Sequence, residues 1–232
     1  MSIASNLMAI QHRVREAAES CARSPGDVQL TAVTKTVDLD MVEAAYAAGV
    51  RHFGENRVQD LRRKFEQRPG PECTVHLIGP LQTNKVRDAV RYADLIETVD
   101  RESLIDAIER RCEFEQKHIE ILIQVNVAGE AQKHGCSPEH VDTLLTRINE
   151  MPRLVVRGLM TIAPLVDDPE DVRPVFRQLR ELRDASQERH PDVHLTELSM
   201  GMTNDYWVAI EEGATMIRLG RAIFDGQGVS SP

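Results

Sequence analysis

The fold of this chain is indicated first by the stretch Val28-Gln29-Leu30-Thr31-Ala32-Val33-Thr34-Lys35-Thr36-Val37. Its apolar and β-branched residues do not alternate cleanly with polar ones, which is typical of a strand covered on both faces in a parallel sheet. Lys35 closes this run. Burial of its ammonium group would favour the neutral amine, the form that attacks aldehydes, so Lys35 is a candidate for a Schiff base. The alternative is that the strand ends before residue 35 and the amine points into solvent.

Other apolar runs follow along the chain, and longer amphipathic segments separate them. The eight predicted strands lie near residues 28–35, 50–54, 74–79, 94–98, 119–127, 154–160, 194–199 and 215–219. The predicted helices lie at 39–48, 57–67, 84–92, 101–117, 138–149, 169–189 and 205–212, with an additional N-terminal helix at about 3–22. Strict alternation predicts a parallel sheet, and eight repeats predict its closure into a (β/α)8 TIM barrel.

The length and composition are compatible with one such barrel. A barrel of this type commonly takes about 250 residues, and this chain has 232. No linker or shift in composition divides the chain, so residues 1–232 are predicted to form a single domain. The net charge of −9 and the aromatic content of 4% argue against a nucleic-acid partner.

The cysteines and the apolar segments indicate the cellular setting. Cys21, Cys73, Cys112 and Cys136 are far apart and form no CxxC pair, which is typical of reduced thiols. No leader sequence and no apolar stretch of membrane-spanning length is present. We therefore expect a soluble cytoplasmic protein with no membrane partner. The histidines show no HExxH motif or close ligand spacing, so no metal site is expected.

Polar residues and glycines cluster where the predicted strands end. In a TIM barrel these ends meet on one face, where the chemistry takes place. Gly201 follows the seventh strand and Gly220 the eighth. Glycine lets an anion approach the backbone, and the amides of the following helix supply donors, so these two loops predict a phosphate site. The alternative is that both are only turn glycines.

The same strand ends carry a family resemblance that runs through nearly the whole chain. Its motifs, in order, are Ala32-Val33-Thr34-Lys35, Phe53-Gly54-Glu55-Asn56, His76-Leu77-Ile78-Gly79, Leu81-Gln82, Asn84-Lys85, Gln124-Val125-Asn126, Gly158-Leu159-Met160, Leu198-Ser199-Met200-Gly201-Met202 and Ile217-Arg218-Leu219-Gly220. Together they resemble the YggS/PROSC family of pyridoxal 5′-phosphate (PLP) homeostasis proteins. That family is a single-domain relative of the alanine-racemase barrel.

The resemblance implies a role for each site residue. Lys35 would form the Schiff base with PLP, Asn56 and Met200 would lie beside the cofactor, and Arg218 would face its pyridine nitrogen. The phosphate would be held by Ser199, Gly220 and the backbone amide of Arg221. Two positions depart from the family pattern: Thr203 stands where serine is frequent, and Arg221 where a small hydroxyl residue is frequent.

Three functions remain open from the sequence. The first is a carrier that buffers PLP and could pass it to PLP-dependent apoenzymes. The second is an amino-acid racemase, which needs an acid–base group on each face of the substrate Cα. In related racemases one group is normally a tyrosine from a second domain of the partner subunit. We expect that domain to be missing here, because the chain ends eight residues after Phe224. Tyr206 would then be the nearest substitute for that tyrosine.

The third possible function is a lysine-dependent aldolase. Without the second domain, a monomer is expected.

Several other residues have two interpretations. Lys85 could bind a second PLP or could be an ordinary solvated lysine. Lys133 could bind a second PLP or could be part of a surface loop. His76 is interpreted as a core histidine whose hydrogen bonds are satisfied. The charge-rich segment 170–190 is interpreted as a solvated helix face with i,i+4 ion pairs.

Overall fold

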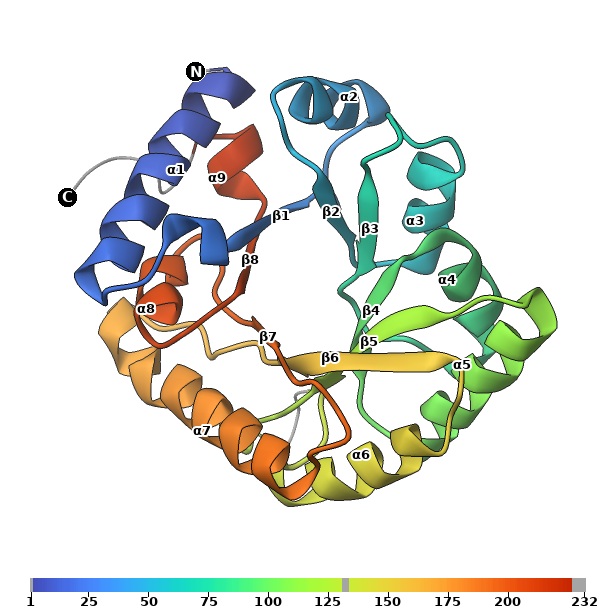
Figure 1. The fold of residues 1–232 in the computed structure, drawn as a ribbon. Coiled ribbons are helices and arrows are strands. Elements are labelled where there is room, and N and C mark those ends of the chain that lie inside the picture. Colours follow the sequence, from blue (N-terminus) through green and yellow to red (C-terminus); the bar gives the residue numbers. More distant parts are fainter. Residues whose placement is uncertain (1, 131–133, 227–232) are drawn as a thin grey trace.

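The computed structural model describes residues 2–130 and 134–226. Within them, eight strands form a closed barrel in which each strand pairs in parallel with the next and β8 pairs with β1 (Figure 1). The strands are β1 Gln29–Val33, β2 His52–Glu55, β3 Thr74–Leu77, β4 Leu95–Val99, β5 Ile119–Gln124, β6 Leu154–Met160, β7 Glu197–Ser199 and β8 Met216–Leu219. The prediction of a (β/α)8 barrel is confirmed.

Helices form the outer layer around the strands (Figure 1). They are α1 Ile3–Ser20, α2 Leu39–Ala47, α3 Val58–Phe65, α4 Val86–Tyr92, α5 Glu102–Glu115, α6 Val141–Asn149, α7 Arg173–Arg189, α8 Tyr206–Glu211 and α9 Arg221–Phe224. The predicted N-terminal helix is α1, which packs beside α8 and α9. The short helix α9 was not predicted. Across the described ranges, no helix is long and apolar enough to cross a membrane.

The first strand is shorter than its apolar pattern predicts. β1 ends at Val33, and the chain turns after Thr34, whose carbonyl accepts a hydrogen bond from the N–H of Val37 at 3.2 Å. Thr34 is buried, but Lys35 lies beyond the strand and is exposed. The prediction that Lys35 is buried in a strand is therefore wrong, and the alternative that the strand ends before residue 35 is confirmed.

A buried ion pair lies directly behind this turn. Lys64 of α3 places its Nζ 2.7 Å from Oε1 of Glu55, and the exposed fractions of the two side chains are 1% and 0%. The same Nζ donates to the carbonyl of Thr34 at 2.5 Å, and the Thr34 hydroxyl donates to Oε1 of Glu55 at 2.7 Å. The pair thus anchors the residue before Lys35 to β2 and α3.

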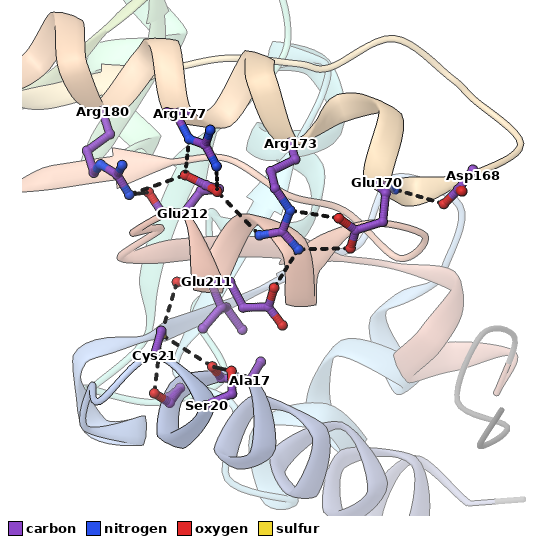
Figure 2. A network of polar contacts seen from close by, with 12 residues as sticks. Ala17, Ser20, Cys21, Asp168, Glu170, Arg173, Arg177, Arg180, Glu211 and Glu212 are labelled. Carbon is purple, nitrogen blue, oxygen red and sulfur yellow. Dashed lines mark hydrogen bonds and ion pairs between the residues drawn. The ribbon is translucent and has the colours of Figure 1, made fainter.

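Three arginines of α7 converge on the end of α8 (Figure 2). Arg173 donates to Glu211 at 2.6 Å, Arg177 donates to Glu212 at 2.8 Å, and Arg180 donates to the Glu212 carbonyl at 2.9 Å. Burial acts to raise the pKa of Glu212, but the hydrogen bonds from Arg177 and Arg173 outweigh it, and the pKa lies below its ordinary value. The prediction of a merely solvated face was therefore wrong in part, because these arginines fasten α7 to α8.

Candidate functional site

A cavity of about 380 Å³ opens at the carboxyl ends of β1, β6, β7 and β8. This volume lies within the range of about 300–1,000 Å³ that is typical of small-ligand sites. The cavity lies at the end of the barrel where TIM-barrel proteins carry their chemistry. Its lining comes from the ends of β1 and β8 and from the segments that follow the four strands.

Lys35 and Gly220 line the cavity just beyond the ends of the neighbouring strands β1 and β8. Gly220 has an ordinary φ of −114°, so backbone conformation does not require a glycine there. A Cβ at this position would lie 3.2 Å from the carbonyl oxygen of Val33, which is a tight contact. The glycine keeps the backbone accessible, and Arg221 begins α9 immediately after it. This geometry suits an anion beside the backbone.

Arg218 lies in the barrel interior at the base of the cavity, with 4% of its surface exposed. Its Nη2 donates to the carbonyl of Thr161 at 2.8 Å, and its Nη1 donates to Oγ of Ser199 at 2.5 Å. Burial lowers the pKa of Arg218, while the carboxylates of Glu97 and Asp205 act in the opposite direction. The guanidinium is therefore held from two sides beneath the space that a ligand would occupy.

The loop after β7 forms another wall. Gly201 has a φ of +93°, and a Cβ on it would lie 2.6 Å from that of Ala209, so both conformation and packing require glycine. Asp205 accepts a hydrogen bond from the N–H of Met202 at 2.6 Å. Burial raises the pKa of Asp205, against the effects of the Met202 N–H and Arg218. This hydrogen bond closes the turn, and Thr203 and Asp205 line the cavity.

The structure separates the predicted site residues into two groups. Those that line the cavity are Lys35, Arg218, Gly220 and Arg221, together with the variant position Thr203. Those that do not line it are Asn56, Ser199, Met200 and Gly201. Ser199 and Met200 are fully buried, and the Ser199 hydroxyl contacts core side chains instead of an open space. These contacts do not favour the predicted phosphate role of Ser199.

A second cavity, of about 540 Å³, lies beside the loops after β2, β3 and β4. Asn56 and Lys85 line this cavity and not the first. Lys133, the other predicted second-site lysine, lies outside the described residues. Asn56 is therefore not at the wall of the Lys35 cavity.

Tyr206, the tyrosine suggested as a substitute acid, does not line the Lys35 cavity. Tyr206 is buried, with its ring against that of Trp207 at a centroid distance of 5.4 Å. Burial raises its pKa, which the nearby Arg13 of α1 opposes. Neither Tyr206 nor the other two tyrosines, Tyr46 and Tyr92, line the cavity. The expectation that Tyr206 lies near the site is wrong, because its side chain faces the outer helix layer.

The cavity wall that follows β6 was not predicted from the sequence. Residues Ala163, Pro164, Leu165 and Val166 line the cavity, and Leu165 is 88% exposed. The only available signal was an apolar segment after a predicted strand, which is also typical of an ordinary connection. These residues supply an apolar surface against which a planar ligand could pack.

Residues 2–130 and 134–226 contain no group of three His, Cys, Asp or Glu side chains placed to hold a metal ion. All four cysteines are free. Burial raises the pKa of Cys73 and Cys112 to about 11, and that of Cys136 to about 12. At neutral pH these three thiols are protonated and poor nucleophiles.

The fold and the site define the class of protein. Residues 5–227 match the family model described as alanine racemase, N-terminal domain. Among solved structures of low identity, an alanine racemase from Clostridium difficile superposes with a TM-score of 0.75 at 11% identity, over 96% of this chain and 56% of that one. At that identity the likeness concerns the fold alone.

Closer relatives specify the family. The chain is 42% identical over 224 residues to the pyridoxal phosphate homeostasis protein of Aquifex aeolicus, covering 97% of this chain and 98% of that protein. It is 37% identical to the protein of the same name from Escherichia coli K12, covering 98% of each. PipY of Synechococcus elongatus, solved with PLP bound, superposes with a TM-score of 0.85 at 35% identity, over 96% and 100% of the two chains. The chain belongs to the family of pyridoxal phosphate homeostasis proteins.

Proposed function

We propose that this protein binds PLP in the cavity beside Lys35 and serves as a carrier of it, without robust catalysis of its own. The observation that carries the proposal is the meeting of Lys35, Arg218 and Gly220 at one cavity. A free amine, a fixed guanidinium and an accessible backbone match the three polar features of PLP, its aldehyde, ring nitrogen and phosphate. Relatives named pyridoxal phosphate homeostasis protein and the PLP-bound structure of PipY support PLP as the ligand.

Lys35 is the proposed covalent attachment point. PLP supplies an aldehyde, and a primary amine condenses with it to a Schiff base with loss of water. Lys35 lines the cavity while remaining exposed. Its turn is fixed by Lys64 and Glu55, so the amine projects from a defined point of the backbone. Gly220 and the amides that begin α9 are the proposed phosphate contacts.

Arg218 is the proposed partner of the ring nitrogen. A guanidinium has donors and no acceptor, so a pyridine nitrogen that faces it accepts a hydrogen bond and stays unprotonated. An unprotonated ring is a weaker electron sink than one protonated by a carboxylate. Arg218 therefore favours holding PLP over stabilising carbanions.

An amino-acid racemase is the second candidate function, and one observation favours testing it. Asp205 is an acidic side chain in the cavity lining, and burial raises its pKa, so it is the acid that a racemase reaction at this site would use. Its carboxylate, however, is bonded to the N–H of Met202. Each tyrosine of the chain lies away from the cavity lining.

The deciding experiment is incubation of the PLP-loaded protein with L-alanine, L-serine and L-glutamate. We expect no racemisation and no transamination over hours, because Arg218 weakens the electron sink, no tyrosine lines the described cavity, and Asp205 is already bonded to the N–H of Met202. Chiral chromatography and absorption spectra measure this. Rapid, Lys35-dependent racemisation would establish an enzyme instead, and Asp205→Asn would then identify the acid. A protein that is colourless after purification and stays so with added PLP would favour the aldolase alternative.

The phosphate contacts are tested by Gly220→Asp. The new Cβ lies 3.2 Å from the Val33 carbonyl, and the new carboxylate repels phosphate. We expect the dissociation constant for PLP to rise at least tenfold, about 1.4 kcal/mol. Spectrophotometric titration measures the affinity, and Gly220→Ala separates the steric part from the charge. An unchanged affinity with a collapsed melting temperature would make Gly220 a turn glycine only.

A further inference from the structure

A line of polar side chains crosses the barrel interior beneath the cavity. Arg218 of β8 contacts Ser199 of β7, Ser199 contacts Glu97 of β4, Glu97 contacts His76 of β3, and His76 contacts His52 of β2. These residues come from strands on different sides of the barrel, so only its interior can bring them together. Ser199 and Glu97 are fully buried.

The proton positions in this line follow from the chemistry of Glu97. An ionised carboxylate only accepts hydrogen bonds. Its Oε2 lies 2.6 Å from Oγ of Ser199, and its Oε1 lies 2.7 Å from Nδ1 of His76. The Ser199 hydroxyl hydrogen and a proton on Nδ1 of His76 must therefore both point at Glu97. This leaves a lone pair of Ser199 directed at Nη1 of Arg218, which donates to it.

The carboxylate is ionised and compensates the charge of Arg218. Burial alone would raise the pKa of Glu97, but His76, Arg218 and the Ser199 hydrogen bond outweigh it, so the pKa lies below its ordinary value. The nearest atoms of Arg218 and Glu97 are 3.8 Å apart, with Ser199 between them. Burial and His76 together lower the pKa of His52 to about 4, so the far end of the line is neutral at pH 7.

Arg218 has a long side chain, and ordering it costs conformational entropy. Its Nη2 is held by the Thr161 carbonyl and its Nη1 by Ser199. The carbonyl belongs to the backbone, so Ser199 and the carboxylate behind it are the side chains that fix the guanidinium. Their removal would leave the Thr161 carbonyl as the remaining hydrogen-bond partner of the guanidinium among the described residues, and its Nη1 would no longer be held.

We propose that Glu97, held by His76 and acting through Ser199, is a positioning residue that aims the guanidinium of Arg218 at the ring nitrogen of bound PLP. This inference rests on the proposed function. It assigns Ser199 to the support of Arg218 in place of a phosphate contact. None of the three residues touches the ligand.

The test compares PLP with an analogue whose ring nitrogen is replaced by CH. Wild-type protein should bind PLP about tenfold more tightly, the ratio that one hydrogen bond of about 1.4 kcal/mol gives. In Ser199→Ala and Glu97→Gln the preference should fall to about twofold or less. A purely structural role would weaken both ligands equally and leave the ratio unchanged. Glu120→Gln, which alters a half-buried glutamate of β5 that pairs with Arg157, is the matched control and should keep the wild-type ratio.

Each outcome decides the inference. Folded variants that keep the tenfold preference would overturn it, and so would a wild-type protein without any preference. A wild-type protein that binds neither ligand would overturn the proposed function as well. Ser199→Ala removes only one oxygen, so it supplies the answer if Glu97→Gln does not fold. Far-ultraviolet circular dichroism of each unloaded variant verifies folding before titration.

Discussion

Lys35→Ala is expected to give a colourless protein that still binds PLP, but reversibly and at least tenfold more weakly. The covalent link requires the amine of Lys35, whereas the contacts proposed for Gly220 and Arg218 are separate from it. Absorption spectra before and after borohydride reduction measure the covalent link, and equilibrium dialysis measures the remaining affinity.

Lys85→Ala is the control for this experiment. Lys85 lines the second cavity, so its replacement should leave the yellow colour of the loaded protein unchanged. A Lys35→Ala protein that stays yellow and is reduced by borohydride in the Lys35 cavity would contradict the assignment. Peptide mapping would then locate the modified lysine, with Lys85 and Lys133 as the first residues to examine.

Of the variants described, Lys64→Met is expected to cause the largest loss of stability, about 3–5 kcal/mol of unfolding free energy. It leaves the carboxylate of Glu55 buried without its cation. Oε2 of Glu55 already finds no hydrogen-bond partner in the part of the chain that the structure describes. Since Lys64 also holds the carbonyl of Thr34, affinity for PLP should fall together with stability. Urea denaturation monitored by circular dichroism gives the free energy.

Two further variants show that charge burial is the cause. The double variant Glu55→Leu/Lys64→Met removes both charges and should recover most of the lost stability, because an apolar pair replaces the ion pair. Lys85→Met, at an exposed lysine, should change the free energy by less than about 0.5 kcal/mol. A double variant as unstable as the single one would mean that Lys64 acts through its packing or its bond to Thr34, and not through Glu55.

The barrel was predictable because its signal is local. Each apolar run reports burial of the few residues within it, and its alternation with amphipathic segments implies parallel pairing. For this reason β6 begins and ends where the sequence placed it, at Leu154–Met160. Strand ends were less predictable. β1 stops at Val33, because the chain turns after Thr34 and the Thr34 carbonyl accepts a hydrogen bond from Lys64 of α3. No pattern within β1 can reveal this partner.

The charged helix illustrates the same limit. Its sequence shows opposite charges at helical spacing, which favours pairs within the helix. Arg177 instead binds Glu212, 35 residues away in the chain. A local pattern shows which charges are present but not which distant partner folding brings to them.

The sequence by itself determined the class of fold, the family and the cavity residues Lys35, Arg218 and Gly220. These follow from periodicity and from ordered motifs at strand ends, both of which are properties of the linear chain. The tertiary structure alone decided that Lys35 is exposed at a cavity instead of buried, that Ser199 accepts a hydrogen bond from Arg218, that Asn56 lines a second cavity, and that Tyr206 does not line the first one. The physical reason is that burial, charge compensation and hydrogen-bond partners depend on residues that are remote in sequence and meet only when the barrel closes. Glu97 is the clearest case, because nothing in its own strand indicates that it faces a serine of β7 and a histidine of β3.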